Sequence, residues 1–344
     1  MIDRNKELEN KLVNLLEQTA GQTEKKEEQA MIVNSMIALY KATDEKEYVN
    51  KAKQMLDKYT ADKDATNTAN TEDAANTTEL AKDNKISKYL WGNAFYNIGD
   101  YSGDSMYIDK AVELAACFHQ QPRNKIGCFS SNSESEEMVL SDFYCTQPFY
   151  MNYDTRNGGK EHYNDIIAQY NAVSSVLFDS CKNLCDEYVR PYDLLMKNSN
   201  EIIKKIKSDK SLYEAFVYYA ASLIDTMELM AQPLYEIYRK LQEYYKVAVT
   251  LLLQSKTQEN VQDKSVYAML SYVILKGCRM KALLTEKYEH VAVELLEKIF
   301  HSISTQDQPL EAKYVAAASF AYSEWIRNRE YQDYGINKGG VLWS

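Results

Sequence analysis

Apolar residues recur every three to four positions through most of the chain, as Ile32, Met36 and Leu39 illustrate. This spacing places apolar side chains on one face of an α-helix. The pattern is almost continuous over 217–253, where Pro233 predicts a break between two helices. No comparable stretch has the period of two that is typical of a β-strand. The pattern therefore predicts an all-α protein.

Four short segments share one design, in which a helix ends, the chain turns through small or charged residues, a tyrosine follows and another helix begins. The tyrosines are Tyr48, Tyr107, Tyr163 and Tyr288, separated by 59, 56 and 125 residues. Expected helices follow them over 49–59, 108–119, 164–178 and 289–302.

A repeat of about 57 to 60 residues divides the chain into about six helical hairpins. Six hairpins can close into a ring, which predicts an (α/α)6 toroid. An open α-solenoid built from the same units is the alternative.

The chain has 344 residues, of which only 11 are Gly and five are Pro, and this scarcity favours long helices. We expect a single domain over residues 1–344. Residues 60–82 are rich in Thr, Asn, Asp and Ala and lack large apolar side chains. This composition predicts an exposed polar connection.

The formal net charge is −10, and no block of Lys and Arg offers the basic surface that nucleic acid would need. The longest uncharged apolar runs, such as 247–253, fall far short of the roughly 20 residues that span a bilayer. Residues 1–18 lack the short apolar segment of a secretory signal. We therefore expect a cytoplasmic protein that binds neither nucleic acid nor membrane.

Among the six cysteines only Cys181 and Cys185 are close in sequence, and their spacing suits neither a disulfide framework nor a zinc site. Reduced, packed thiols are expected. No two of the four histidines have metal-ligand spacing along the sequence, and no Gly-rich phosphate loop is present. The sequence therefore assigns no metal and no cofactor.

Five stretches, in order along most of the chain, carry a resemblance to a known family: His119–Gly127 (HQQPRNKIG), Met138–Phe149 (MVLSDFYCTQPF), Tyr153–Tyr170, Ser265–Arg279 and Ala321–Trp325. Through them the chain resembles the unsaturated rhamnogalacturonyl hydrolases of glycoside hydrolase family 105. The related unsaturated glucuronyl hydrolases of family 88 are similar too, and both families have (α/α)6 barrels.

The resemblance implies a hydrolase that removes a 4,5-unsaturated uronic acid from the non-reducing end of pectin or glycosaminoglycan fragments. In that chemistry an aspartic acid protonates the double bond and then activates water. Such a carboxyl must be protonated near neutral pH, which requires partial desolvation. The implied partner is an unsaturated oligosaccharide.

The catalytic motif departs from the family pattern. In the rhamnogalacturonyl branch the acid/base aspartate lies seven residues before the proline of a Pro-Phe pair, a place that Ser141 holds here. Asp142 lies six residues before Pro148, which is closer to the glucuronyl branch, and is the only carboxylate in the motif. We therefore expect Asp142 to be the acid/base; a helix N-cap is the alternative role.

Two further elements implied by the resemblance are missing. The second aspartate would fall within 87–89, and the Trp-, Arg- and Gly-rich segment would fall within 193–217, yet neither is found. A catalytically weakened family member that binds carbohydrate or protein without turnover is therefore a second hypothesis. An open solenoid that binds a helical peptide is a third.

Four residues are candidate substrate-binding groups. Trp91 is expected to stack on a sugar ring and Tyr144 to line the cleft, although both also suit a helical core. Arg279 and Arg190 are expected to hold the substrate carboxylate, because a guanidinium fork fits a carboxylate. For Arg279 the alternative is a solvated charge at a helix C-terminus.

Overall fold

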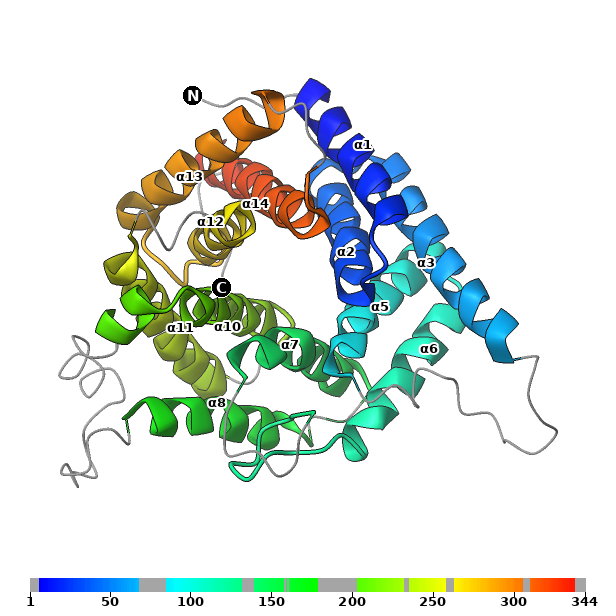
Figure 1. Ribbon diagram of the computed structural model, residues 1–344, viewed down its shortest axis with the longest axis horizontal. Helices are drawn as coiled ribbons and strands as arrows, with labels where there is room; N and C mark the ends of the chain where they lie inside the picture. The colour runs from blue at the N-terminus through cyan, green and yellow to red at the C-terminus, as the bar shows by residue number, and fades with distance from the viewer. Residues whose placement is uncertain are drawn as a thin grey trace. The chain divides into compact units, whose positions relative to one another are not determined.

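The computed structural model describes residues 6–67, 85–131, 139–157, 159, 161–178, 203–231, 235–257, 263–305 and 310–337. Helices dominate these residues (Figure 1). The described part contains no β-strand, and its strand-like pairing is an isolated bridge between Arg123 and Phe129. The all-α prediction is confirmed.

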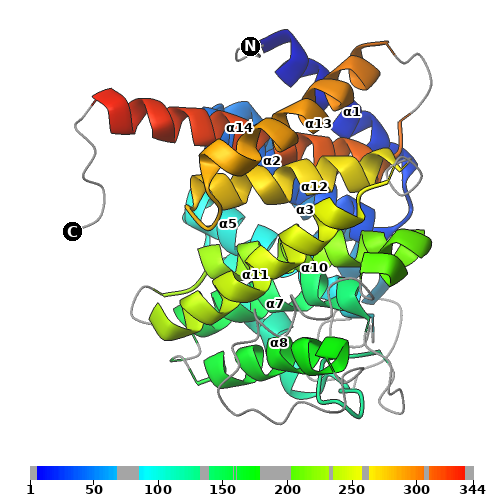
Figure 2. The ribbon, with the colours of Figure 1, turned by 90° about the vertical axis from the view of Figure 1, so that its left-hand side faces the viewer.

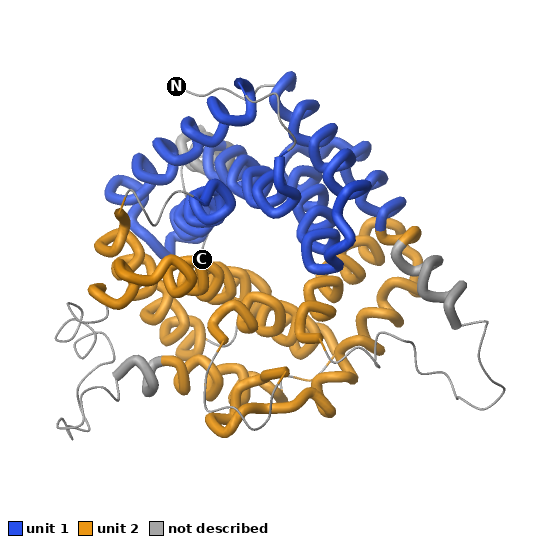
Figure 3. The backbone as a smooth tube through the Cα atoms, in the orientation of Figure 1, with its two compact units in different colours: residues 1–55, 261–344 blue, residues 56–260 orange. Residues whose placement is uncertain are grey.

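The chain divides into two compact units (Figure 3). Unit 1 comprises residues 1–55 and 261–344, and unit 2 comprises residues 56–260. Helix α3 (Lys46–Asn67) crosses the boundary between them.

In unit 1, α14 (Ala312–Asn337) packs between α2 (Lys26–Thr43) and α12 (Lys264–Arg279). Helix α1 (Lys6–Gln22) packs against α2 and α14, and α13 (Thr285–Thr305) packs against α12 and α14 (Figure 2). The last helix of the chain thus contacts the first two. A closed ring requires this contact, whereas an open solenoid keeps its terminal hairpins apart.

In unit 2, the central helix is α7 (Leu140–Arg156). On one side it packs against the 3₁₀-helix η1 (Ile86–Trp91) and α5 (Gly92–Ser102), and on the other against α10 (Lys210–Glu228). The ring of Phe143 contacts Tyr219, and Thr155 donates to the carbonyl of Leu229, so α7 and α10 run parallel.

A covering layer packs on these central helices of unit 2. It consists of α6 (Ser105–Ala116), the short 3₁₀-helix η2 (Cys117–His119), α8 (Tyr163–Phe178) and α11 (Tyr235–Ser255). Central and covering helices alternate along the chain, as the hairpin repeat predicts. The break expected at Pro233 falls between α10 and α11, although Pro233 itself lies outside the described residues.

Three of the four repeat tyrosines have a common structural role, whereas Tyr288 of α13 is half-buried and its hydroxyl bonds to no described residue. Tyr48, Tyr107 and Tyr163 are buried near the start of α3, α6 and α8, and their hydroxyls bond to an earlier helix. Tyr48 donates to Glu9 of α1 (3.3 Å), Tyr107 donates to Asp57 of α3, and Tyr163 bonds to Thr155 of α7 (2.8 Å). In three of its four occurrences the sequence repeat therefore marks a contact between the start of one helix and a helix earlier in the chain.

Helix α3 is longer than the sequence predicted. Helix α3 continues past the expected end at residue 59, so residues 60–67 are helical rather than part of the polar connection; residues 68–82 lie outside the described part. No helix within the described ranges combines the length and the apolar character needed to cross a bilayer.

Candidate functional site

Asp142 lies in the first turn of α7 and is half-buried. Among the described residues its carboxyl has no hydrogen-bond or ion-pair partner. Burial therefore acts unopposed and raises the pKa of Asp142 to about 6. The N-cap of α7 is Val139, without a side-chain cap, so the capping role considered for Asp142 is wrong.

The neighbouring side chains of Ser141 and Asp142 project in different directions, because an α-helix turns by about 100° per residue. Tyr150, nine residues after Ser141, lies on the opposite face of α7 and packs against aromatic rings of the covering layer. Ser141 therefore projects from the face of α7 that points away from the covering layer, here called the inner face. Asp142 shares a stripe with Phe149, whose ring packs on η1 and α5.

The different directions of the Ser141 and Asp142 side chains bear on which of the two positions corresponds to the acid/base of the family. The position that family spacing assigns to the acid/base, Ser141, is on the inner face. The available carboxylate, Asp142, is one residue further along and lies about 100° round the helix, on the stripe of Phe149. In η1 itself, residues 87–89 are Ser, Lys and Tyr, and both Lys88 and Tyr89 are buried. This part of η1 brings no carboxylate toward Asp142.

The two aromatic candidates differ in exposure. Trp91 is 1% exposed and lies in the core, so its indole cannot stack on a sugar ring in this structure. Tyr144 remains half-buried on α7, and its ring meets Tyr218 of α10 edge-on, with centroids 5.2 Å apart. Of the pair, only Tyr144 has exposed surface for a ligand.

Arg279 is the last residue of α12, in unit 1. Its guanidinium donates to both carboxylate oxygens of Glu324 in α14, with Nε–Oε2 at 2.6 Å and Nη2–Oε1 at 3.2 Å. The Arg279 side chain is 14% exposed. It is therefore not the solvated charge that the sequence offered as an alternative, and its guanidinium already binds a carboxylate of the protein instead of being available to a substrate. Arg190 lies outside the described residues.

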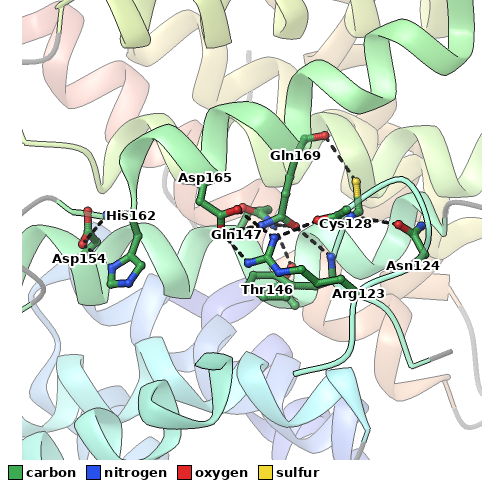
Figure 4. Close-up of polar contacts among 11 residues, drawn as sticks. Arg123, Asn124, Cys128, Thr146, Gln147, Asp154, His162, Asp165 and Gln169 are labelled. Atoms are coloured by element: carbon green, nitrogen blue, oxygen red, sulfur yellow. Dashed lines mark hydrogen bonds and ion pairs between the residues drawn. The ribbon is translucent and has the colours of Figure 1, made fainter. Parts of the chain in front are cut away.

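A polar network that sequence reasoning missed lies between α7, α8 and the segment 121–130 (Figure 4). Arg123 makes a bidentate ion pair with Asp165, with Nη1–Oδ1 at 2.9 Å and Nη2–Oδ2 at 2.7 Å. Gln169 donates to Asp165 and accepts from Gln147, and both glutamines are buried. The network holds segment 121–130 against α7 and α8.

No sequence spacing signals this network, because the contacts that join its different segments link residues 22 to 42 positions apart in sequence. Of the cysteines, Cys117, Cys128, Cys145 and Cys278 are free thiols, while Cys181 and Cys185 lie outside the described part. Within the described ranges, no group of three or more His, Cys, Asp or Glu side chains could hold a metal ion.

Solved structures of glycoside hydrolases are similar to almost the whole chain. A family 105 glycoside hydrolase from C. acetobutylicum is 17% identical, with a TM-score of 0.62 over 90% of this chain and 98% of its own. A possible GH105 member from Salmonella enterica serovar Paratyphi A is 13% identical, with a TM-score of 0.66 over 96% of each chain. A family 88 glycosyl hydrolase from Bacteroides vulgatus is 12% identical, with a TM-score of 0.53 over 95% of this chain and 100% of its own.

At these identities the likeness shows the fold alone, which is the (α/α)6 toroid that the sequence predicted. No curated protein matches the chain. The sequence model of Glycosyl Hydrolase Family 88 matches residues 5–197, more than half of the chain. The chain belongs to Glycosyl Hydrolase Family 88.

Proposed function

We propose that this protein hydrolyses unsaturated uronyl oligosaccharides, the rhamnogalacturonyl or glucuronyl products of polysaccharide lyases, and that Asp142 is the acid/base. One observation carries the proposal: Asp142 is half-buried, has no partner among the described residues and has a pKa raised to about 6. A carboxyl with this pKa is protonated often enough near neutral pH to donate, and once ionised it can accept a proton.

In the proposed reaction Asp142 donates its proton to the 4,5 double bond of the terminal uronate. The resulting carboxylate then takes a proton from the water molecule that adds at C5, so Asp142 ends the cycle protonated. The hemiketal formed at C5 opens by breaking its bond to the ring oxygen, and the hemiacetal left at the anomeric carbon then releases the remaining saccharide as an alcohol. This hydration differs from ordinary glycoside hydrolysis, in which two carboxylates flank the scissile bond. One correctly placed carboxyl is sufficient for both proton transfers.

The test uses unsaturated disaccharides made by lyases from pectin, hyaluronan and chondroitin, and follows the loss of the ultraviolet absorbance of the double bond. We expect turnover of at least one product, and its loss in Asp142→Asn. Asp109→Asn is the matched control, because Asp109 is exposed on α6 and should leave turnover unchanged. Absence of turnover on all three products would overturn the proposal.

A second candidate function is carbohydrate binding without turnover. The inner-face position of Ser141, at the place the family spacing gives to the acid/base, specifically favours it. This hypothesis predicts measurable affinity for the same disaccharides, no absorbance loss, and a gain of turnover in Ser141→Asp. If Asp142 is the acid/base, Ser141→Asp should instead give no gain, because the added carboxyl would project in a different direction from that of Asp142.

A further inference from the structure

Two histidines that are far apart in sequence meet at the surface of unit 2. His119 ends η2 and His162 immediately precedes α8, 43 residues later. Their imidazole rings have centroids 5.8 Å apart, with an angle of 64° between the ring planes. His119 is exposed and the side chain of His162 is 24% exposed, so solvent reaches both rings.

A buried carboxylate orients one of the two rings (Figure 4). Asp154, near the end of α7, is 0% exposed, and its Oδ1 lies 3.0 Å from Nδ1 of His162. The same oxygen accepts a hydrogen bond from the backbone N–H of His162 at 3.2 Å. Because a carboxylate can only accept, Nδ1 carries the proton in neutral His162, which leaves the lone pair on Nε2. No described residue bonds to this second nitrogen.

This arrangement is the usual one for an imidazole that binds a metal. A metal-ligating histidine commonly donates its other ring N–H to a carboxylate, which fixes the tautomer and strengthens the ligand. A zinc–nitrogen bond is about 2.0 to 2.1 Å long, so two imidazoles on one tetrahedral ion have ring centroids about 5 to 6 Å apart. The separation of His119 and His162 lies within this range.

We propose that His119 and His162 together bind one divalent late first-row transition-metal ion, for which Zn²⁺ is the probe. Asp154 accepts the Nδ1–H of His162 and so orients its ring. Water fills the remaining coordination positions of the ion, because no described cluster supplies a third protein ligand. The site joins the end of η2 to the start of α8 in unit 2. It is separate from Asp142, at the opposite end of α7 from Asp154, and is independent of the proposed hydrolysis.

The experiment is calorimetric titration of the tag-free, metal-depleted full chain with ZnCl₂ at pH 7.5. We expect one site, weakened by about tenfold or more in His119→Ala, a variant that should fold normally because His119 is exposed. Asp154→Asn should weaken binding by about 10- to 100-fold, since it removes the carboxylate behind His162. Zinc should also raise the melting temperature of the wild type more than that of His119→Ala.

His290→Ala is the matched control, because His290 is an exposed histidine on α13 in unit 1. Its affinity for zinc should equal that of the wild type. Binding that is absent in the wild type, or that is unchanged in His119→Ala, would overturn the proposal.

Discussion

Gly92, the first residue of α5, lies directly against the ring of Phe149 in α7, and a methyl group added at Gly92 would overlap the ring carbons. Phe149 is two helical turns beyond Asp142 on the same stripe of α7. The absence of a side chain at Gly92 therefore sets how closely α5 approaches the side of α7 that carries Asp142.

Substitution of this glycine should loosen the packing between α5 and α7. We expect Gly92→Ala to lower the free energy of unfolding by about 1 to 3 kcal/mol, the usual cost of overpacking a core. The control is Gly21→Ala in α1, where an added Cβ meets nothing within 4 Å. That variant should be neutral or gain up to about 1 kcal/mol from helix propensity. Urea unfolding measures both, and equal stability of the two variants would contradict the prediction.

Asp142 should destabilise the fold at neutral pH. Its pKa is about 6 in the folded chain, against about 3.9 in an unfolded one. Between these values the folded state keeps a proton that the unfolded state releases, so stability falls as the pH rises from about 4 to 6. Asp142→Asn should therefore be more stable than wild type at pH 7.5, by at most about 3 kcal/mol.

Below about pH 4 both states of the wild type are protonated, and the advantage of Asp142→Asn should disappear. Urea unfolding at pH 3.5 and 7.5 gives the two differences. A difference of the same size at both pH values would mean that burial of the charge is not its cause. Asp109→Asn, at an exposed position, should change stability little at either pH.

The hydroxyl of Tyr107 stabilises the start of α6 through its bond to Asp57. Tyr107→Phe keeps the ring and removes the hydrogen bond to a charged group, so the free energy of unfolding should fall by about 1.5 to 3 kcal/mol. Tyr235→Phe is the control, because Tyr235 is 67% exposed and should change stability by less than about 0.5 kcal/mol. Thermal unfolding measures the stability of both variants. Equal stability of Tyr107→Phe and Tyr235→Phe would show that the repeated tyrosine contact is not stabilising.

The Arg279–Glu324 pair should be structural. Arg279→Ala leaves a buried carboxylate whose remaining ion-pair partner among the described residues is Arg327, at 2.9 Å, so we expect a loss of about 1 to 3 kcal/mol. Lys298→Ala breaks the exposed pair with Glu294 and should cost less than about 1 kcal/mol. A stable Arg279→Ala variant with weakened oligosaccharide binding would instead support the substrate-binding role expected from the sequence.

Much of the fold could be predicted because helix formation leaves a local trace. The three- to four-residue apolar spacing predicted the helices, and the tyrosines predicted where α6 and α8 begin. Helix ends were harder, since α3 runs to Asn67 through a polar composition typical of loops. Helix α7 likewise continues through Pro148, although a proline commonly ends a helix.

The candidate site was only partly predictable. Asp142 was found by its place in a motif, and its raised pKa fits the expected role. Trp91 and Arg279 were chosen by residue type, which says nothing about exposure, and the structure places one in the core and the other against Glu324. Exposure depends on segments far away in the sequence, so residue type cannot supply it.

The sequence by itself determined the all-α class, the hairpin repeat and the family, because each depends on residues that are near one another along the chain. Only the tertiary structure decided that Ser141 and not Asp142 occupies the inner face of α7, and that His119 meets His162 across 43 residues. The physical reason is that side-chain direction and burial arise from packing between helices, which no single segment encodes.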